Sequence, residues 1–224
     1  MLVVGFPAGP LQANCYLLAP AEGEGCVIVD PGQEVGEPLA ERLRTHRLTP
    51  LAVLLTHGHF DHSYSAASIC EEYGVPVWVH PDDRPMLADP LRGLGPDVAA
   101  LLGGRLEMSE PAEVRDLADG ATLEFGGLSI GVDHTPGHTG GSVCFHTGPP
   151  GGDGPDRLML SGDTLFAGSI GRTDLPGGDH ERMLTTLRTR VLTLPDETTV
   201  LPGHGPTTTI GRERAVNPFL RRGL

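Results

Sequence analysis

Short apolar runs separated by glycine, proline and acidic turns dominate the chain and predict a protein rich in β-strands. Strands are predicted over residues 1–6, 13–18, 25–29, 51–56 and 75–80, and again over 121–125, 128–133, 142–146, 157–160 and 198–201. Apolar residues at helical spacing predict helices near residues 37–46, 63–73, 179–193 and 208–216. Two strand-rich halves, each followed by helices, predict an α+β fold, a four-layered αββα sandwich.

Two segments lack this regular spacing. Residues 81–111 are rich in proline and glycine, and we expect a short helix plus a loop. Residues 147–156 contain mainly Gly, Pro and Asp, which is typical of an exposed hairpin connection. Neither segment resembles a linker, so we expect a single domain over residues 1–224.

The strongest chemical signal is the segment 56–62, Thr-His-Gly-His-Phe-Asp-His, which directly follows the apolar run 51–55. It places His57, His59, Asp61 and His62 on one short loop at a strand end. Imidazole and carboxylate groups together suit Zn, Mn, Fe or Ni. Polar groups packed this closely are costly to bury without an ion, so the loop predicts a metal site.

Further His and Asp residues stand beside or close to glycine after apolar runs. They are Asp30 after 26–29, His134 and His138 after 128–133, Asp163 after 158–160, and His204 after 199–201. Glycine permits the tight backbone turns that direct such side chains to a common centre, and binding residues often lie on loops held by a rigid scaffold. We therefore expect the separate segments to form one site at one edge of the sheets.

These motifs, in this order, closely resemble those of the metallo-β-lactamase-fold hydrolases: Asp30, the HxHxDH set at 57–62, His138, Asp163 and His204. Within that superfamily, the phrases at 134–139 and 168–174 look like the glyoxalase II group. The second phrase looks most like its short, single-domain hydroxyacylglutathione hydrolase-like members. The resemblance covers nearly the whole chain and supports the same αββα sandwich.

The resemblance implies a metal-dependent hydrolase with two divalent metal ions. Zinc is the expected metal, and iron or manganese are the alternatives. One ion would be held by His57, His59 and His138, and the other by Asp61, His62 and His204. Asp163 would bridge them. A hydroxide between the ions would attack a carbonyl carbon, and Asp61 is the candidate catalytic residue that orients this nucleophile.

A thioester substrate of the S-lactoylglutathione type is implied by the same resemblance. A thiolate, with a free-thiol pKa near ~8.5, leaves without a general acid. Arg172 is the candidate substrate-binding residue, because a guanidinium offers paired donors to a carboxylate. The alternative for Arg172 is an ordinary ion pair with Asp174 or Asp179.

Three polar residues near the ligand motifs are assigned supporting roles. Asp30 is expected to hold the ligand loop through hydrogen bonds to the backbone. His134 is interpreted as orienting a neighbour, and His80 as a structural residue or a similar support.

The chain departs from full-length glyoxalase II, because only 20 residues follow His204, and we expect it to lack the helical C-terminal region that contacts glutathione in those enzymes. Other readings therefore stay open. A persulfide dioxygenase would hold a single iron through His57, His138 and Asp163. A lactonase or β-lactamase could use the same ligands on a cyclic ester or amide. A non-enzymatic binding module or a nuclease of the same fold is less well supported.

Charge and cysteine usage narrow the choice of partner and location. A net charge of −13, with 16 arginines and no lysine, disfavours nucleic acid as a partner and excludes Schiff-base chemistry by a side-chain amine. The four cysteines are scattered without a CxxC pair and are read as buried thiols. Without a signal-peptide pattern or a membrane-spanning run, we expect a cytoplasmic protein that acts on a small-molecule thioester.

Overall fold

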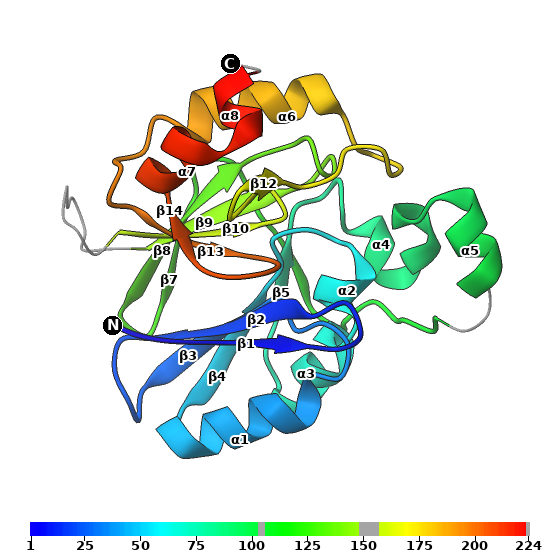
Figure 1. Ribbon diagram of the computed structural model, residues 1–224. Coiled ribbons are helices and arrows are strands. Elements are labelled where there is room, and N and C mark those ends of the chain that lie inside the picture. Colours follow the sequence, from blue (N-terminus) through cyan, green and yellow to red (C-terminus); the bar gives the residue numbers. More distant parts are fainter. Residues whose placement is uncertain (103–105, 148–156, 223–224) are drawn as a thin grey trace.

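Two six-stranded mixed sheets lie face to face in the computed structural model, which describes residues 1–102, 106–147 and 157–222 (Figure 1). The first sheet runs in the order β1 to β6, comprising Leu2–Ala8, Ala13–Ala19, Gly25–Val29, Thr49–Leu54, Val77–Val79 and Val114–Asp116. The second sheet has the order β14-β13-β10-β9-β8-β7. Its members, from β7 to β14, are Thr122–Phe125, Leu128–His134, Val143–Thr147, Leu158–Gly162, Thr199–Pro202 and Thr208–Thr209. A small hairpin pairs β11 (Leu165–Phe166) with β12 (Ser169–Ile170).

Alternate side chains of strand β3 contribute to two different hydrophobic cores. Val27 and Val29 pack between the sheets, with residues such as Ile130 and Phe145 of the second sheet. Cys26 and Ile28 point the other way, into the core under the helices. Because successive side chains of a strand face opposite sides, a strand covered on both faces reads as a continuous apolar run.

Helices cover the outer face of each sheet. Figure 1 shows α1 and α3 against the first sheet and α6, α7 and α8 against the second. The helices are α1 (Gly36–His46), α2 (Phe60–Ser63), α3 (Ala66–Tyr73), α4 (Pro85–Ala88), α5 (Pro96–Leu102), α6 (His180–Thr186), α7 (Ile210–Val216) and α8 (Pro218–Arg222), with a 3-10 turn at Pro90–Gly93 and a π-helical turn at Leu187–Val191. The predicted four-layered αββα sandwich is confirmed.

The differences from the predicted elements have local causes. The helix predicted over 208–216 begins at Ile210, because Thr208 and Thr209 pair with β13 and the Thr209 hydroxyl accepts the Arg212 N–H at 3.2 Å. Strand β6 and the β11–β12 hairpin were not predicted, since each is only two or three residues long. Segment 81–111 contains α4, the 3-10 turn and α5, where one short helix was expected.

Two further sequence predictions concern the connection at 147–156 and the lack of a membrane-spanning segment. Residues 148–156 of the predicted connection at 147–156 lie outside the described residues. Within the described part of the chain, none of the helices is long and apolar enough to cross a membrane.

Candidate metal centre

The candidate ligands follow strand ends at one edge of the two sheets. Strands β3 and β4 are parallel neighbours, as are β10 and β13, so their carboxyl ends meet at the same edge. Asp30, the 57–62 loop, Asp163 and His204 come directly after these four strands. His138 lies on the β8–β9 loop, and the nearby Val143 N–H donates to the Thr56 carbonyl at 2.8 Å. This bond ties the ligand loops of the two sheets together.

The first ligand set consists of His57, His59 and His138, whose donor atoms lie within 4.8 Å of one another. All three residues are buried. Nδ1 of His59 lies 2.9 Å from Nε2 of His138, while Nε2 of His57 is buried without a hydrogen-bond partner among the described residues. The three imidazole nitrogens converge on one point.

The second set consists of Asp61, His62 and His204, again within 4.8 Å. Nε2 of His62 lies 3.2 Å from Nε2 of His204, and an oxygen of Asp61 lies 3.3 Å from the same His204 nitrogen. His204 is the most open of the three, with 28% of its side chain exposed. This set faces solvent more than the first.

Asp163 lies between the two sets. Its Oδ1 is 3.3 Å from Nε2 of His62, and its Oδ2 is 3.6 Å from Nε2 of His138 and 3.7 Å from Nε2 of His204. Gly203 makes this approach possible, because a Cβ at that position would collide with the Asp163 carboxylate. The carboxylate therefore touches both sets.

The donor chemistry of these residues fits bound divalent ions. Nε2 of His57 and Oδ1 of Asp163 are buried and lack hydrogen-bond partners among the described residues, which is costly unless an ion satisfies them. Pairs of imidazole nitrogens 2.9 and 3.2 Å apart can share at most one proton, whereas a metal accepts both lone pairs. Nitrogen and carboxylate oxygen ligands suit zinc, iron and manganese.

The ionisation of the site agrees with a bound cation. Burial lowers the pKa of His57 well below its ordinary value, and burial together with His138 lowers the pKa of His59 to about 3, so both rings are neutral. Burial opposes the charged form of His62, yet Asp163 and Asp61 outweigh it and raise the pKa of His62. Burial alone would raise the pKa of Asp163, but the charge of the nearby His62 lowers it. Positive charge is favoured beside Asp163, and a bound metal ion would supply it there.

Comparison with known protein families matches residues 8–204 to the Metallo-beta-lactamase superfamily. The match spans most of the chain and includes every candidate ligand. The chain belongs to the metallo-β-lactamase superfamily.

Relatives from this superfamily match the chain over nearly its whole length. An uncharacterized protein of Mycobacterium leprae is 52% identical over 98% of this chain and 99% of its own. Hydroxyacylglutathione hydrolase GloC of Haemophilus influenzae is 35% identical over 96% of this chain and 95% of its own. The superfamily and these relatives support a metal-dependent hydrolase.

Two solved structures share both fold and sequence with the chain. The BLEG-1 B3 metallo-beta-lactamase is 39% identical, with a TM-score of 0.85 over 98% of this chain and 99% of that one. TTHA1623 in a di-iron-bound form is 43% identical, with a TM-score of 0.78 over 97% of this chain and 100% of that one. A dinuclear centre therefore occurs in a protein of this fold and similar sequence.

Asp30 supports the ligand loop of this superfamily site, as the sequence predicted. Its carboxylate accepts the Thr56 N–H at 2.8 Å and the Thr56 hydroxyl at 2.6 Å, and Nδ1 of His62 donates to it at 3.0 Å. The bond from His62 leaves Nε2 facing the second set. Partners of this kind fix the tautomer and orientation of a metal-binding histidine.

Arg172 reaches the site through its backbone. Its carbonyl oxygen accepts a hydrogen bond from Nδ1 of His138 at 2.8 Å, which leaves Nε2 of His138 for the metal. Its guanidinium forms two 2.8 Å bonds with Asp174 on the surface. The ion pair considered as the alternative role of Arg172 is present.

His134 and His80 lie beside the site and are not part of either ligand set. Their rings stack with centroids 4.1 Å apart, and Nε2 of His134 lies 2.8 Å from the Gly140 carbonyl. His134 therefore holds the loop that follows His138, in line with the supporting role predicted for it.

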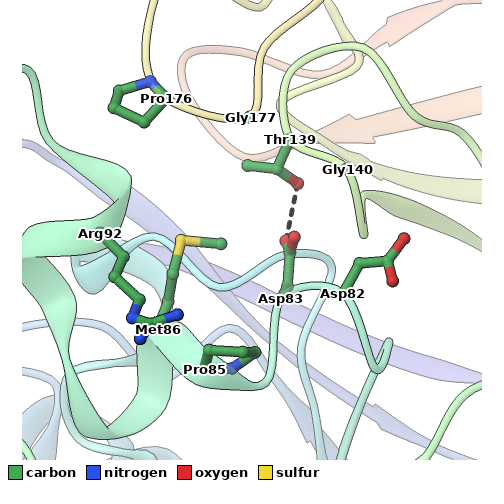
Figure 2. Close-up of a pocket in the computed structure, with 9 residues that line it drawn as sticks. All are labelled: Asp82, Asp83, Pro85, Met86, Arg92, Thr139, Gly140, Pro176 and Gly177. Carbon is green, nitrogen blue, oxygen red and sulfur yellow. Dashed lines mark hydrogen bonds between the residues drawn. The ribbon is translucent and has the colours of Figure 1, made fainter.

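Sequence reasoning missed Asp83 and the pocket above it. A pocket of about 300 Å³ adjoins the loop that follows His138 and is lined by residues including Met86, Arg92, Thr139 and Gly140 (Figure 2). Asp83 is one of the residues that line this pocket and is only 1% exposed. Burial raises the pKa of Asp83, although hydrogen bonds from Thr139, Gly58 and Gly141 oppose this effect. No pattern in the sequence separates Asp83 from its neighbour Asp82.

Proposed function

We propose that the protein is a glyoxalase II-like thioesterase that hydrolyses S-acyl thioesters of the S-lactoylglutathione type at a dinuclear centre. The observation that carries the proposal is the presence of two complete ligand sets that share Asp163. The similarity to GloC over nearly the full length of both chains supports the substrate class.

The ions, proposed to be zinc with iron or manganese as alternatives, would supply Lewis acidity and lower the pKa of water toward ~7. Asp61 has an oxygen 3.3 Å from Nε2 of His204, at the more open side of the site. Burial alone would raise the pKa of Asp61, but the neighbouring His62 and His204 lower it, so the carboxylate is ionised and can accept a hydrogen bond that orients an attacking water molecule. A thiolate leaves as an anion, so these residues need not deliver a proton to it.

The pocket beside the first set offers a place for one end of the substrate. Arg92 lies on its wall, with Nε 3.3 Å from Asp89 and 62% of its side chain exposed. Arg92 lines this pocket and makes one 3.3 Å contact with Asp89, whereas Arg172 is not among the lining residues and makes two 2.8 Å bonds with Asp174, so we propose Arg92 as the residue that binds a substrate carboxylate. Replacing Arg92 by Ala is then expected to raise KM for carboxylate-bearing thioesters and to leave KM for neutral thioesters unchanged.

The test of the function is a substrate panel on protein purified without chelators. Hydrolysis of S-lactoylglutathione that disappears in the His138→Ala variant is expected. Oxygen consumption with glutathione persulfide, at one iron per chain, would overturn the proposal in favour of a dioxygenase.

We also propose that nucleic acid is not a partner of this protein. Oligonucleotide binding that weakens as the salt concentration rises would contradict this proposal.

A second candidate is β-lactam hydrolysis, because the BLEG-1 B3 metallo-beta-lactamase is 39% identical and matches the chain over 98% of its length. Amide cleavage differs from thioester cleavage in that the leaving nitrogen must receive a proton. Turnover of a cephalosporin exceeding that of S-lactoylglutathione would favour this candidate.

A further inference from the structure

Asp83 is a buried carboxylate that belongs to neither ligand set. It lies in the turn between β5 and α4. Its Oδ2 accepts the Gly58 N–H at 2.9 Å and the Thr139 hydroxyl at 2.6 Å, and its Oδ1 accepts the Gly141 N–H at 2.8 Å. Burying a carboxylate is costly, and these three donors offset that cost.

The three donors belong to the two loops that carry the first ligand set. Gly58 stands between His57 and His59, and Thr139 directly follows His138. A single carboxylate therefore connects the loop after β4 with the loop after β8. Figure 2 shows the Asp83 carboxylate directed at the Thr139 hydroxyl.

Both loops come so close to Asp83 that only glycine fits. A Cβ at position 58 would lie 2.7 Å from the Asp83 carbonyl oxygen, and a Cβ at position 141 would lie 2.6 Å from Asp83 Cγ. Thr139 is held further by Ser142, whose hydroxyl lies 2.7 Å from the Thr139 hydroxyl and accepts the Thr139 N–H at 3.1 Å. The contacts form a closed network around one side chain.

We propose that Asp83 is a positioning residue that fixes the His57–His59 loop relative to His138 and thereby sets the metal affinity of the first set. The inference rests on the proposed metal-binding role of that set. An uncharged amide cannot replace the carboxylate, because its NH₂ group would face the Gly141 N–H or the two donors at Oδ2.

The test measures metal binding without substrate, so its result is separate from the outcome of the thioesterase assay. Metal-free protein in a His204→Ala background, which weakens the second set, is titrated with Zn²⁺ against a chromophoric chelator and with Co²⁺ by visible absorption. The Asp83→Asn variant is expected to lose affinity by roughly 10- to 100-fold and to show an altered Co²⁺ spectrum. The control is Asp116→Asn, which removes an exposed carboxylate 4.0 Å from Arg84 and is expected to change neither readout. Wild-type affinity and a wild-type Co²⁺ spectrum in Asp83→Asn would overturn the proposal.

If Asp83→Asn does not fold, Thr139 decides the question. Thr139→Val removes one of the three donors, and Thr139→Ser keeps the hydroxyl. We expect Thr139→Val to weaken Zn²⁺ binding and Thr139→Ser to restore it. Equal affinity in both variants would contradict the positioning role.

Discussion

The two ligand sets have the same number of donors, but they differ in charge and exposure. The first set has three buried imidazoles and no carboxylate of its own, and a single carboxylate, Asp83, fixes its loops from outside. The second includes Asp61 and the partly exposed His204, and its buried His62 is oriented by Asp30. The first set is thus wholly buried, whereas the second is partly open to solvent.

From this difference in exposure we infer separate roles for the two ligand sets. We expect a buried set of neutral nitrogens to release an ion more slowly than a set that is partly exposed. The second set lies at the open side, where Asp61 can meet water and substrate. Asp163 couples the halves because its oxygens lie between 3.3 and 3.7 Å from nitrogens of both sets.

The largest expected effect follows from removing the shared carboxylate. Asp163→Ala should reduce the metal content to below one ion per chain and lower the rate of hydrolysis by more than ~100-fold. This loss exceeds the roughly 10- to 100-fold loss typical of removing a residue that only hydrogen-bonds to a metal ligand. Elemental analysis of protein purified without chelators measures the first effect. Asp174→Ala, which removes an exposed carboxylate, is the control. Two ions retained in Asp163→Ala would show that the sets are independent.

The next effect separates the sets by their rates of metal release. In the presence of a chromophoric chelator the wild-type protein should release its ions in two phases, the faster from the more open second set. His138→Ala should show the fast phase alone and His204→Ala the slow phase alone. Identical release from both variants would mean that exposure does not distinguish the halves.

A smaller effect is expected from Asp30→Asn. The amide would lose acceptors for the Thr56 N–H or for Nδ1 of His62, and one unsatisfied buried group costs about 1–3 kcal/mol. We expect a lower unfolding midpoint in denaturant and roughly 10- to 100-fold weaker binding in the second set. Asp116→Asn again serves as the control, and an unchanged midpoint would argue against the role of Asp30.

The smallest effect is expected from Arg172→Ala. The metal centre uses the carbonyl of this residue, which the substitution keeps, and an exposed ion pair such as Arg172–Asp174 contributes about 0–1 kcal/mol. Steady-state kinetics should show KM within about twofold of wild type, the kinetic equivalent of a few tenths of a kcal/mol. A KM raised more than tenfold would instead return Arg172 to the role of carboxylate anchor predicted from the sequence.

Most candidate ligands could be singled out because they stand beside glycine on a loop that follows an apolar strand, as Asp163 does after β10, and the resemblance to the metallo-β-lactamase-fold hydrolases divided them into two sets. Asp30 could be placed for the same reason. Asp83 could not, because it shares its surroundings with Asp82 and its partners are 25 to 58 positions away in the chain. The role of Arg172 depended on whether Asp174 or a substrate engages its guanidinium, which spacing alone does not decide.

The same limit applies to the fold. Long apolar strands such as β2 and β3 follow from their composition. Strand β14 and the hairpin β11–β12 exist through pairing with distant or adjacent strands, and two residues carry too short a pattern to recognise. Local sequence predicts an element well when the element is long enough to show its period.

The most direct measurement is a crystal structure of protein purified without chelators, with anomalous diffraction recorded at the absorption edges of zinc, iron and manganese. We predict two anomalous peaks roughly 3.5–4 Å apart, one among His57, His59 and His138 and one among Asp61, His62 and His204, with Asp163 between them. A single peak bound by His57, His138 and Asp163, with the second set free of metal, would contradict the dinuclear centre.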